Sequence, residues 1–102
     1  MMLLTKAIKK TIPALYSTDK IELCNKQVAV KFFTPWSNYT WFVFEGRELA
    51  DGDWEFFGMI HGQENEMGYF NLSQLKDIRG PFGLKVERDR SVAFDTYNEG
   101  KL

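Results

Sequence analysis

The sequence predicts an α+β fold: a mostly antiparallel, curled sheet of four to five strands, with an N-terminal helix and a short helix near residues 71–79. Two stretches show helical periodicity, alternating apolar and polar residues lie between and after them, and turn residues separate these segments. At 102 residues, we expect a single domain over residues 1–102 with a frayed tail from about residue 96.

Each expected helix carries a boundary signal. Residues 3–12 repeat apolar side chains near a helical period with lysines between them, and Thr5 is a candidate N-cap. Pro13 disfavours helical geometry in the residue before it, so this helix should end just before the proline. In the second helix, Asn71 is followed three residues later by Gln74, as in a capping box.

Strand signals dominate the rest of the chain. Val28, Val30 and Phe32 alternate with small or polar residues, which predicts the first strand. Residues 39–44 and 54–60 are rich in aromatic side chains and should pair as an antiparallel hairpin.

Turn residues separate these strands from shorter ones. The hairpin loop is expected to contain Glu45-Gly46 and Asp51-Gly52-Asp53. Further strands are expected at residues 68–70, 84–87 and 91–94.

Both faces of the expected sheet are apolar. Neighbouring side chains in a strand point to opposite faces, so Trp41 and Val43 share one face while Phe42 and Phe44 share the other. Two short helices are too small to cover both faces. Either the chain covers the second face itself, or part of that face meets a partner. We favour self-coverage, because large bare apolar patches are rare on monomers.

Composition limits where the protein works. The single cysteine, Cys24, allows no internal disulfide, which favours a reducing compartment. The N-terminus lacks the apolar core of a signal peptide, and no apolar run approaches the ~18 residues of a membrane span. We therefore expect a cytoplasmic protein without membrane contact, either a monomer or a homodimer.

Charge is distributed unevenly along the chain. Residues 41–70 carry seven acidic side chains against Arg47 alone, a net charge of −6, whereas residues 1–40 carry +4. This pattern is typical of alternating solvated faces, or of an acidic patch presented to a basic partner.

Catalytic and metal-binding patterns are missing from the sequence. The only histidine, His61, has no nucleophile motif beside it, and its neighbours Glu64 and Glu66 form at most a weak metal set. No glycine-rich nucleotide-binding motif is present. We therefore expect no enzymatic activity, no cofactor and no metal, and a hydrolase or metal enzyme centred on His61 is the remaining alternative.

The segment Arg79-Gly80-Pro81-Phe82-Gly83 is the sharpest local feature. Gly80 permits a positive φ after a helix, and Gly83 permits a second tight bend. The simplest interpretation is a structural turn between a helix and a strand. The functional alternative is that Arg79 and Arg88 hold an anionic ligand or an acidic side chain of a partner.

The remaining binding candidates are aromatic anchors and an acidic rim, both expected around the hairpin. The anchors are Trp36, Tyr39 and Trp41, and the rim is Asp51, Asp53 and Glu55.

Several motifs occur together over nearly the whole chain: Leu4-Thr5, Pro13-x-Leu15-Tyr16-Ser17-Thr18, Val30-Lys31-Phe32-Phe33-Thr34-Pro35, Trp41, Phe57-Gly58, Glu66-Met67-Gly68-Tyr69-Phe70-x-Leu72-x-x-Leu75, and Arg79-Gly80-Pro81-x-Gly83-Leu84-x-Val86-Glu87-Arg88-Asp89. With them the chain resembles a domain-of-unknown-function family of short bacterial proteins carried on plasmids, integrative elements and phages. The resemblance implies an accessory role on mobile DNA and supplies no catalytic residues.

Two function classes follow. The first is a small non-enzymatic binding protein, an inhibitor of a host-defence nuclease of the anti-CRISPR or anti-restriction type, which uses an acidic, aromatic surface to bind a protein partner. The alternative is a nucleic-acid-binding accessory module for replication or transfer of the element, with Lys6, Lys9 and Lys10 as contacts.

Overall fold

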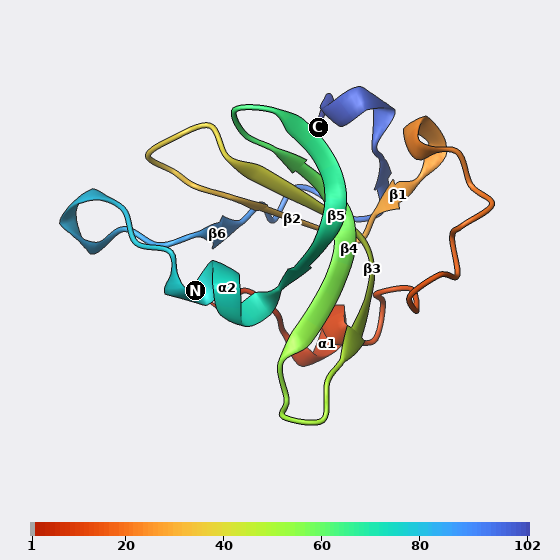
Figure 1. Ribbon diagram of the computed structural model, residues 1–102, viewed down its shortest axis with the longest axis horizontal. Coiled ribbons are helices and arrows are strands. Elements are labelled where there is room, and N and C mark those ends of the chain that lie inside the picture. The colour runs from red at the N-terminus through yellow and green to blue at the C-terminus, as the bar shows by residue number, and fades with distance from the viewer. Residues whose placement is uncertain (1) are drawn as a thin grey trace.

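The structure is a computed structural model and describes residues 2–102 (Figure 1). It contains a twisted antiparallel sheet, two short α-helices and three single-turn 3₁₀ helices. In chain order, the elements are α1 (Lys6–Lys9), η1 (Leu23–Asn25), β1 (Gln27–Val28), β2 (Val30–Phe33), β3 (Thr40–Glu48), β4 (Trp54–His61), β5 (Asn65–Asn71), α2 (Leu72–Asp77), η2 (Pro81–Gly83), β6 (Glu87–Arg88), β7 (Asp95–Thr96) and η3 (Asn98–Gly100).

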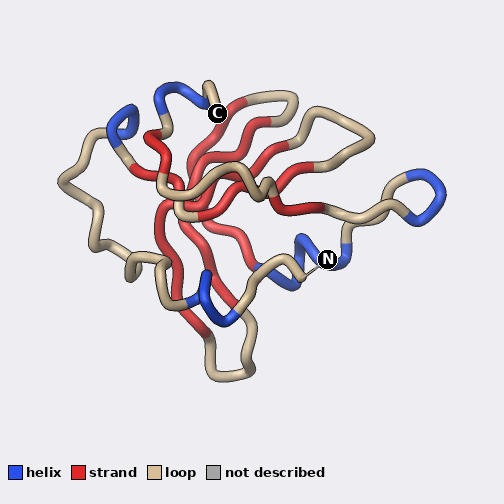
Figure 2. The backbone as a smooth tube through the Cα atoms, turned by 180° about the vertical axis from the view of Figure 1, so that it is seen from behind, coloured by secondary structure: helices blue, strands red, loops and turns tan. Residues whose placement is uncertain are grey.

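The main sheet has five antiparallel strands in the order β5-β4-β3-β2-β6, and β1 pairs separately with β7. The three long strands β3, β4 and β5 form the curved body that Figures 1 and 2 show from opposite sides. The α+β class and the antiparallel sheet are therefore confirmed. β5 forms one edge of this sheet, and the two-residue strand β6 forms the other.

The first face of the sheet is covered by the N-terminal segment and by α2. Their apolar side chains pack with those of the central strands into one buried cluster. The fully buried rings of Phe32 and Phe56 lie 6.0 Å apart at its centre. The buried members are Leu3, Leu4, Val30, Phe32, Trp41, Val43, Trp54, Phe56, Phe70, Leu72, Leu75 and Val86.

The second face carries a separate cluster, which the end of the chain helps to cover. Phe42, Phe44 and Met59 pack there with Tyr97, which is only 4% exposed. From the sequence we expect a frayed tail from about residue 96, and in the structure the start of this tail packs on the sheet through Tyr97. The tail is held because Tyr97 fills an apolar site and its backbone N–H donates to the carbonyl of Lys26 at 2.8 Å.

The strand expected around Val28, Val30 and Phe32 is divided at Ala29. Val30 is the register partner of Val43, and the N–H of Ala29 also donates to the Val43 carbonyl at 2.8 Å. Ala29 and Val30 therefore both lie opposite Val43. This arrangement is a β-bulge, and it interrupts the alternation of side chains between the two faces. As a result, Val28 packs on the second face while Val30 packs on the first.

The hairpin strands are longer than the sequence indicated. Glu45 and Gly46 lie inside β3, and the turn is confined to residues 49–53, where the N–H of Leu49 donates to the carbonyl of Asp53 at 2.7 Å. β5 likewise extends well beyond the expected residues 68–70. The last two strands are short: β6 overlaps the expected residues 84–87 only at Glu87, and β7 lies directly after the expected residues 91–94.

Both helix caps are confirmed. The Thr5 hydroxyl accepts a hydrogen bond from the N–H of Ile8 at 3.2 Å, although α1 spans only Lys6–Lys9. Asn71 and Gln74 form the reciprocal capping box of α2, with the N–H of Asn71 donating to Oε1 of Gln74 at 2.8 Å.

Candidate functional site

The residues expected to form one acidic, aromatic surface lie at opposite ends of β3. Trp36 and Tyr39 precede this strand, while Asp51 and Asp53 follow it. A strand rises about 3.3 Å per residue, so β3, with its nine residues, separates the two groups by roughly 30 Å. In Figure 1 the loops at these two ends, yellow and yellow-green, lie far apart. The anchors and the rim are therefore not brought together.

Trp41 belongs to the core. It is 6% exposed and packs in the cluster of the first face. The expectation that Trp41 is an exposed binding anchor is therefore wrong. Its ring lies 5.9 Å from that of Tyr39. Tyr39 in turn lies against Gly62, because a Cβ on that glycine would come 2.5 Å from the Tyr39 ring.

The three acidic candidates have local partners. Asp53 accepts hydrogen bonds from the Ser73 hydroxyl at 2.7 Å and from the N–H of Trp54 at 2.8 Å. These bonds, that of the Ser73 hydroxyl foremost, hold the pKa of Asp53 below its ordinary value. Asp53 thus ties the hairpin turn to the start of α2.

The other two acids are engaged in the same region. Asp51 accepts from the N–H of Asp53 at 3.0 Å. The carboxylate of Glu55 forms an ion pair with Nε of Arg47 at 2.9 Å. The expected rim is therefore a set of local contacts at the hairpin end of the sheet.

The indole of Trp36 packs against Gly80, the residue that follows Arg79. A Cβ on Gly80 would collide with the indole of Trp36, so the ring requires a glycine at this position. The φ of Gly80 is −104°, not the positive value that the sequence suggested. The Arg79 guanidinium donates to the carbonyl of Ile78 at 3.0 Å and also to that of Lys76. Arg79 therefore caps the end of α2.

Arg88 fixes the N-terminal segment. Its guanidinium donates to the carbonyl of Met2 at 2.6 Å and to that of Leu3 at 3.1 Å. Met2 and Leu3 thus lie beside β6, at the edge of the first face.

His61 contacts the C-terminal segment. Its Nε2 lies 2.5 Å from the Tyr97 hydroxyl, and its ring fills the space that a Cβ on Gly100 would need. Burial lowers the pKa of His61. Among residues 2–102, no group of three or more His, Cys, Asp and Glu side chains is placed to hold a metal ion.

An apolar patch that the sequence analysis missed remains exposed on the second face. Tyr69 and Met67, on β5, are 51% and 41% exposed, and Tyr16, at 63%, comes from the segment before η1. The half-buried ring of Phe57 lies 5.1 Å from that of Tyr69. We call these four residues, Tyr16, Phe57, Met67 and Tyr69, the open patch.

The buried carboxylate of Glu45 positions Tyr16. A second bulge in the β3–β4 pairing lies between Val43 and Glu45, and Glu45 is only 1% exposed. Its oxygens accept from the N–H of Tyr16 at 2.7 Å and from that of Thr18 at 3.0 Å. This anchor holds the segment against the sheet and supports the left-handed φ of +70° at Tyr16.

The surroundings of the open patch are negative. A hydrogen bond with the Tyr16 side chain is the main cause that raises the pKa of the Tyr69 hydroxyl. The charges of Glu45 and Asp19 act in the same direction. The Tyr69 hydroxyl of the open patch therefore lies within the influence of two carboxylates, Glu45 and Asp19.

One signal in the sequence points to this patch. Strand alternation places Phe57 and Met59 on the second face, and the β4–β5 register pairs them with Tyr69 and Met67. The sequence does not predict which part of that face the C-terminal tail covers, because this depends on the long-range packing of Tyr97.

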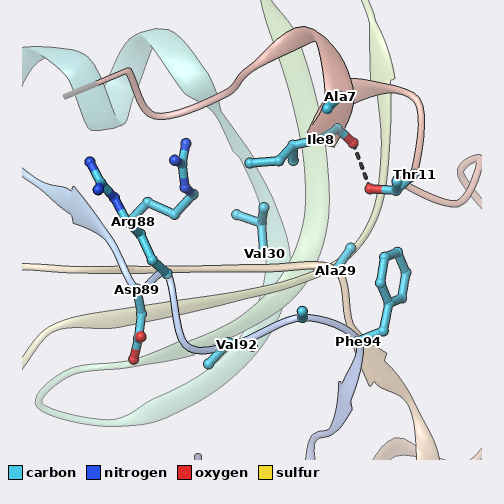
Figure 3. A pocket seen from close by; sticks show the side chains of 11 residues that line it. Ala7, Ile8, Thr11, Ala29, Val30, Arg88, Asp89, Val92 and Phe94 are labelled. Atoms are coloured by element: carbon cyan, nitrogen blue, oxygen red, sulfur yellow. Dashed lines mark hydrogen bonds between the residues drawn. The ribbon is translucent and has the colours of Figure 1, made fainter.

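A small cavity of about 410 Å³ lies between α1 and the segment that precedes β7 (Figure 3). Ile8 and Val30 line it, with Arg88 toward one end and Phe94 toward the other. Asp89 points away from it and forms an ion pair with Nζ of Lys31 at 3.3 Å. The walls are mostly aliphatic and offer few polar groups for chemistry.

A family model described as "Protein of unknown function (DUF2958)" matches residues 3–99. The chain belongs to the DUF2958 family. The match covers both clusters of the core, β5 and the open patch of this DUF2958 chain. No curated protein and no solved structure matches it. Within residues 2–102, no helix is both long enough and apolar enough to cross a membrane.

Proposed function

We propose that this protein is a non-enzymatic binding module that docks on another protein through the open patch. The exposure of Tyr16, Met67 and Tyr69 beside β5 carries the proposal. The protein's own tail packs on another part of the second face, around Phe42, Phe44 and Met59, and leaves the three exposed side chains of the open patch uncovered. Contiguous exposed apolar surface is typical of interaction sites, and tyrosine is enriched among the residues that dominate binding energy.

Charge favours a basic partner. Glu45 and Asp19 act on Tyr69, and Glu66 lies next to Met67 on β5. We propose as partner the nucleic-acid-binding surface of a host-defence nuclease, so that the protein is an inhibitor of the anti-CRISPR or anti-restriction type. The resemblance to proteins of plasmids, integrative elements and phages motivates this class of partner.

The test measures DNA cleavage by purified CRISPR effectors and restriction nucleases with and without the protein. We expect inhibition by at least one of them, and we expect it to weaken as salt rises, because complementary charges steer the encounter. The Tyr69→Ala variant should bind that nuclease about tenfold or more weakly, as for a hot-spot residue.

The matched pair Met67→Ala and Leu84→Ala controls for simple loss of apolar surface. Both side chains are 41% exposed, but only Met67 belongs to the open patch. Only the Met67 variant should weaken inhibition. No slowing of cleavage by any nuclease of these two classes would exclude the proposed partner, and equal effects of the two variants would exclude the open patch as the contact.

A further inference from the structure

A groove of about 710 Å³ lies on a different surface, between the N-terminal segment, α2 and the loop that leads to β6. Its floor is aliphatic and belongs to the buried core of the first face. The floor residues are Leu3, Leu4, Leu72, Leu75 and Val86.

The rim of the groove is basic. Four cationic side chains from three parts of the chain line it, namely Lys9, Lys76, Arg79 and Lys85, and the only acidic lining residue is Glu87. Within residues 2–102, no carboxylate forms an ion pair with any of the four cations. Like charges gathered without counter-charges attract an anionic ligand.

Hydrogen bonds fix the walls before any ligand arrives. Arg88 holds the N-terminal wall through the carbonyls of Met2 and Leu3. On the other side, the loop closes through the N–H of Gly80, which donates to the carbonyl of Leu84 at 2.7 Å. A preorganised groove loses little conformational entropy when it binds.

Beside the groove, this loop carries Phe82 at its tip. Phe82 is 104% exposed and has a left-handed φ of +57°. η2, which contains it, projects from the body in Figures 1 and 2. The exposed Phe82 ring buries no surface within this chain that could offset the strained backbone, and backbone strain of this kind is typical of functional sites.

We propose that the groove binds an acidic peptide segment of a partner protein that carries aliphatic side chains. The carboxylates meet Lys9, Lys76, Arg79 and Lys85, and the aliphatic side chains contact the leucine floor. Phe82 then packs against the partner beyond the groove. This inference goes beyond the open patch, because it concerns a second surface of opposite charge.

The groove lining favours a peptide over nucleic acid. Single-stranded nucleic acid is held by stacking of bases on aromatic rings and by hydrogen bonds to base edges. The lining contains no aromatic, amide or hydroxyl side chain. The lining therefore provides apolar and charged contacts, which suit a peptide that carries both kinds of side chain.

The test uses fluorescence anisotropy with the 102-residue chain and three labelled probes. They are a peptide of alternating Asp and Leu, the same peptide with Asn in place of Asp, and oligo-dT. We expect the Asp-Leu peptide to bind at least about tenfold more tightly than the Asn-Leu peptide, and more weakly as salt rises.

Two double variants with the same change in net charge locate the site. Lys76→Glu/Lys85→Glu reverses two charges on the rim, and Lys20→Glu/Lys101→Glu reverses two exposed charges elsewhere. We expect the first to weaken Asp-Leu binding about tenfold or more and the second to leave it within twofold. Equal weakening by both, or equal affinity for the Asp and Asn peptides, would overturn the proposal. Tight binding of oligo-dT without the Asp-Leu peptide would show a nucleic-acid surface instead. None of these results depends on the open patch.

Discussion

The Tyr97 hydroxyl lies 2.5 Å from Nε2 of His61 and joins the C-terminal segment to the end of β4. The Tyr97 ring also makes edge contacts with Phe42 and Phe44, at centroid distances of 5.2 and 5.5 Å. One residue of the tail therefore supplies both a polar and an aromatic contact. Because Tyr97 covers part of the second face, it also limits how far the open patch extends.

Tyr97→Ala should destabilise the protein by about 3–5 kcal/mol, because it removes a buried aromatic ring and leaves a cavity. Tyr97→Phe keeps the ring and loses only the hydroxyl bond, so its cost should be about 1 kcal/mol. Urea unfolding followed by tryptophan fluorescence measures both. A Tyr97→Ala variant as stable as the wild type would mean that the tail does not cover the second face in solution.

The stability of the protein should fall as the pH falls below about 6.5. Burial lowers the pKa of His61, so between its folded-state pKa and its unfolded-state pKa the unfolded chain binds more protons. Stability therefore rises with pH across this window and levels off above it, where His61 is neutral in both states.

Urea midpoints between about pH 5 and 7.5 measure this dependence. His61 is the only histidine, so His61→Gln should remove most of the slope in this range. If the His61→Gln variant retained the full dependence of stability on pH, other titrating groups would be its cause.

Asp53→Ala should cost about 1–2 kcal/mol, because the carboxylate binds the first turn of α2 in the manner of a helix cap. Since the pKa of Asp53 is lowered, this contribution is present at neutral pH and is lost as acid protonates the folded carboxylate. Glu48→Ala, an exposed acid in the same hairpin, is the control and should change stability by less than about 0.5 kcal/mol. Equal unfolding midpoints for the two variants would count against the cap.

Local signals in the sequence predicted the parts of the fold that local chemistry determines. Thr5 and Asn71 were identified as caps because a cap depends on residues within one helical turn. The bulges at Ala29 and Phe44 were not recognised, because a bulge depends on which strand lies opposite. The burial of Glu45 depends on backbone N–H groups far away in the sequence, at Tyr16 and Thr18.

The candidate site was predicted less well than the fold for the same reason. An aromatic residue in a strand can face the core or the solvent, and only the packing of other segments decides between them. The sequence indicates Trp41 as an exposed anchor, but Trp41 is buried. Tyr69, next to the buried Phe70 on β5, is exposed instead. The composition of residues 41–70 indicated an acidic, aromatic region, but not its arrangement.

Gly58 and Gly68 face each other across β4 and β5, and they should respond differently to the same substitution. A Cβ on Gly58 would collide with the carbonyl oxygen of Phe42 on β3, whereas a Cβ on Gly68 would meet no atom within 4 Å. Gly58→Ala must therefore force β3 and β4 apart, at a cost of about 1–3 kcal/mol or more. Gly68→Ala should be neutral or gain up to about 1 kcal/mol, because it removes the entropy cost of a glycine in a strand. Urea unfolding of the two variants compares these costs directly, and a Gly68→Ala variant as destabilised as Gly58→Ala would contradict the close approach of β3 and β4 at Phe42.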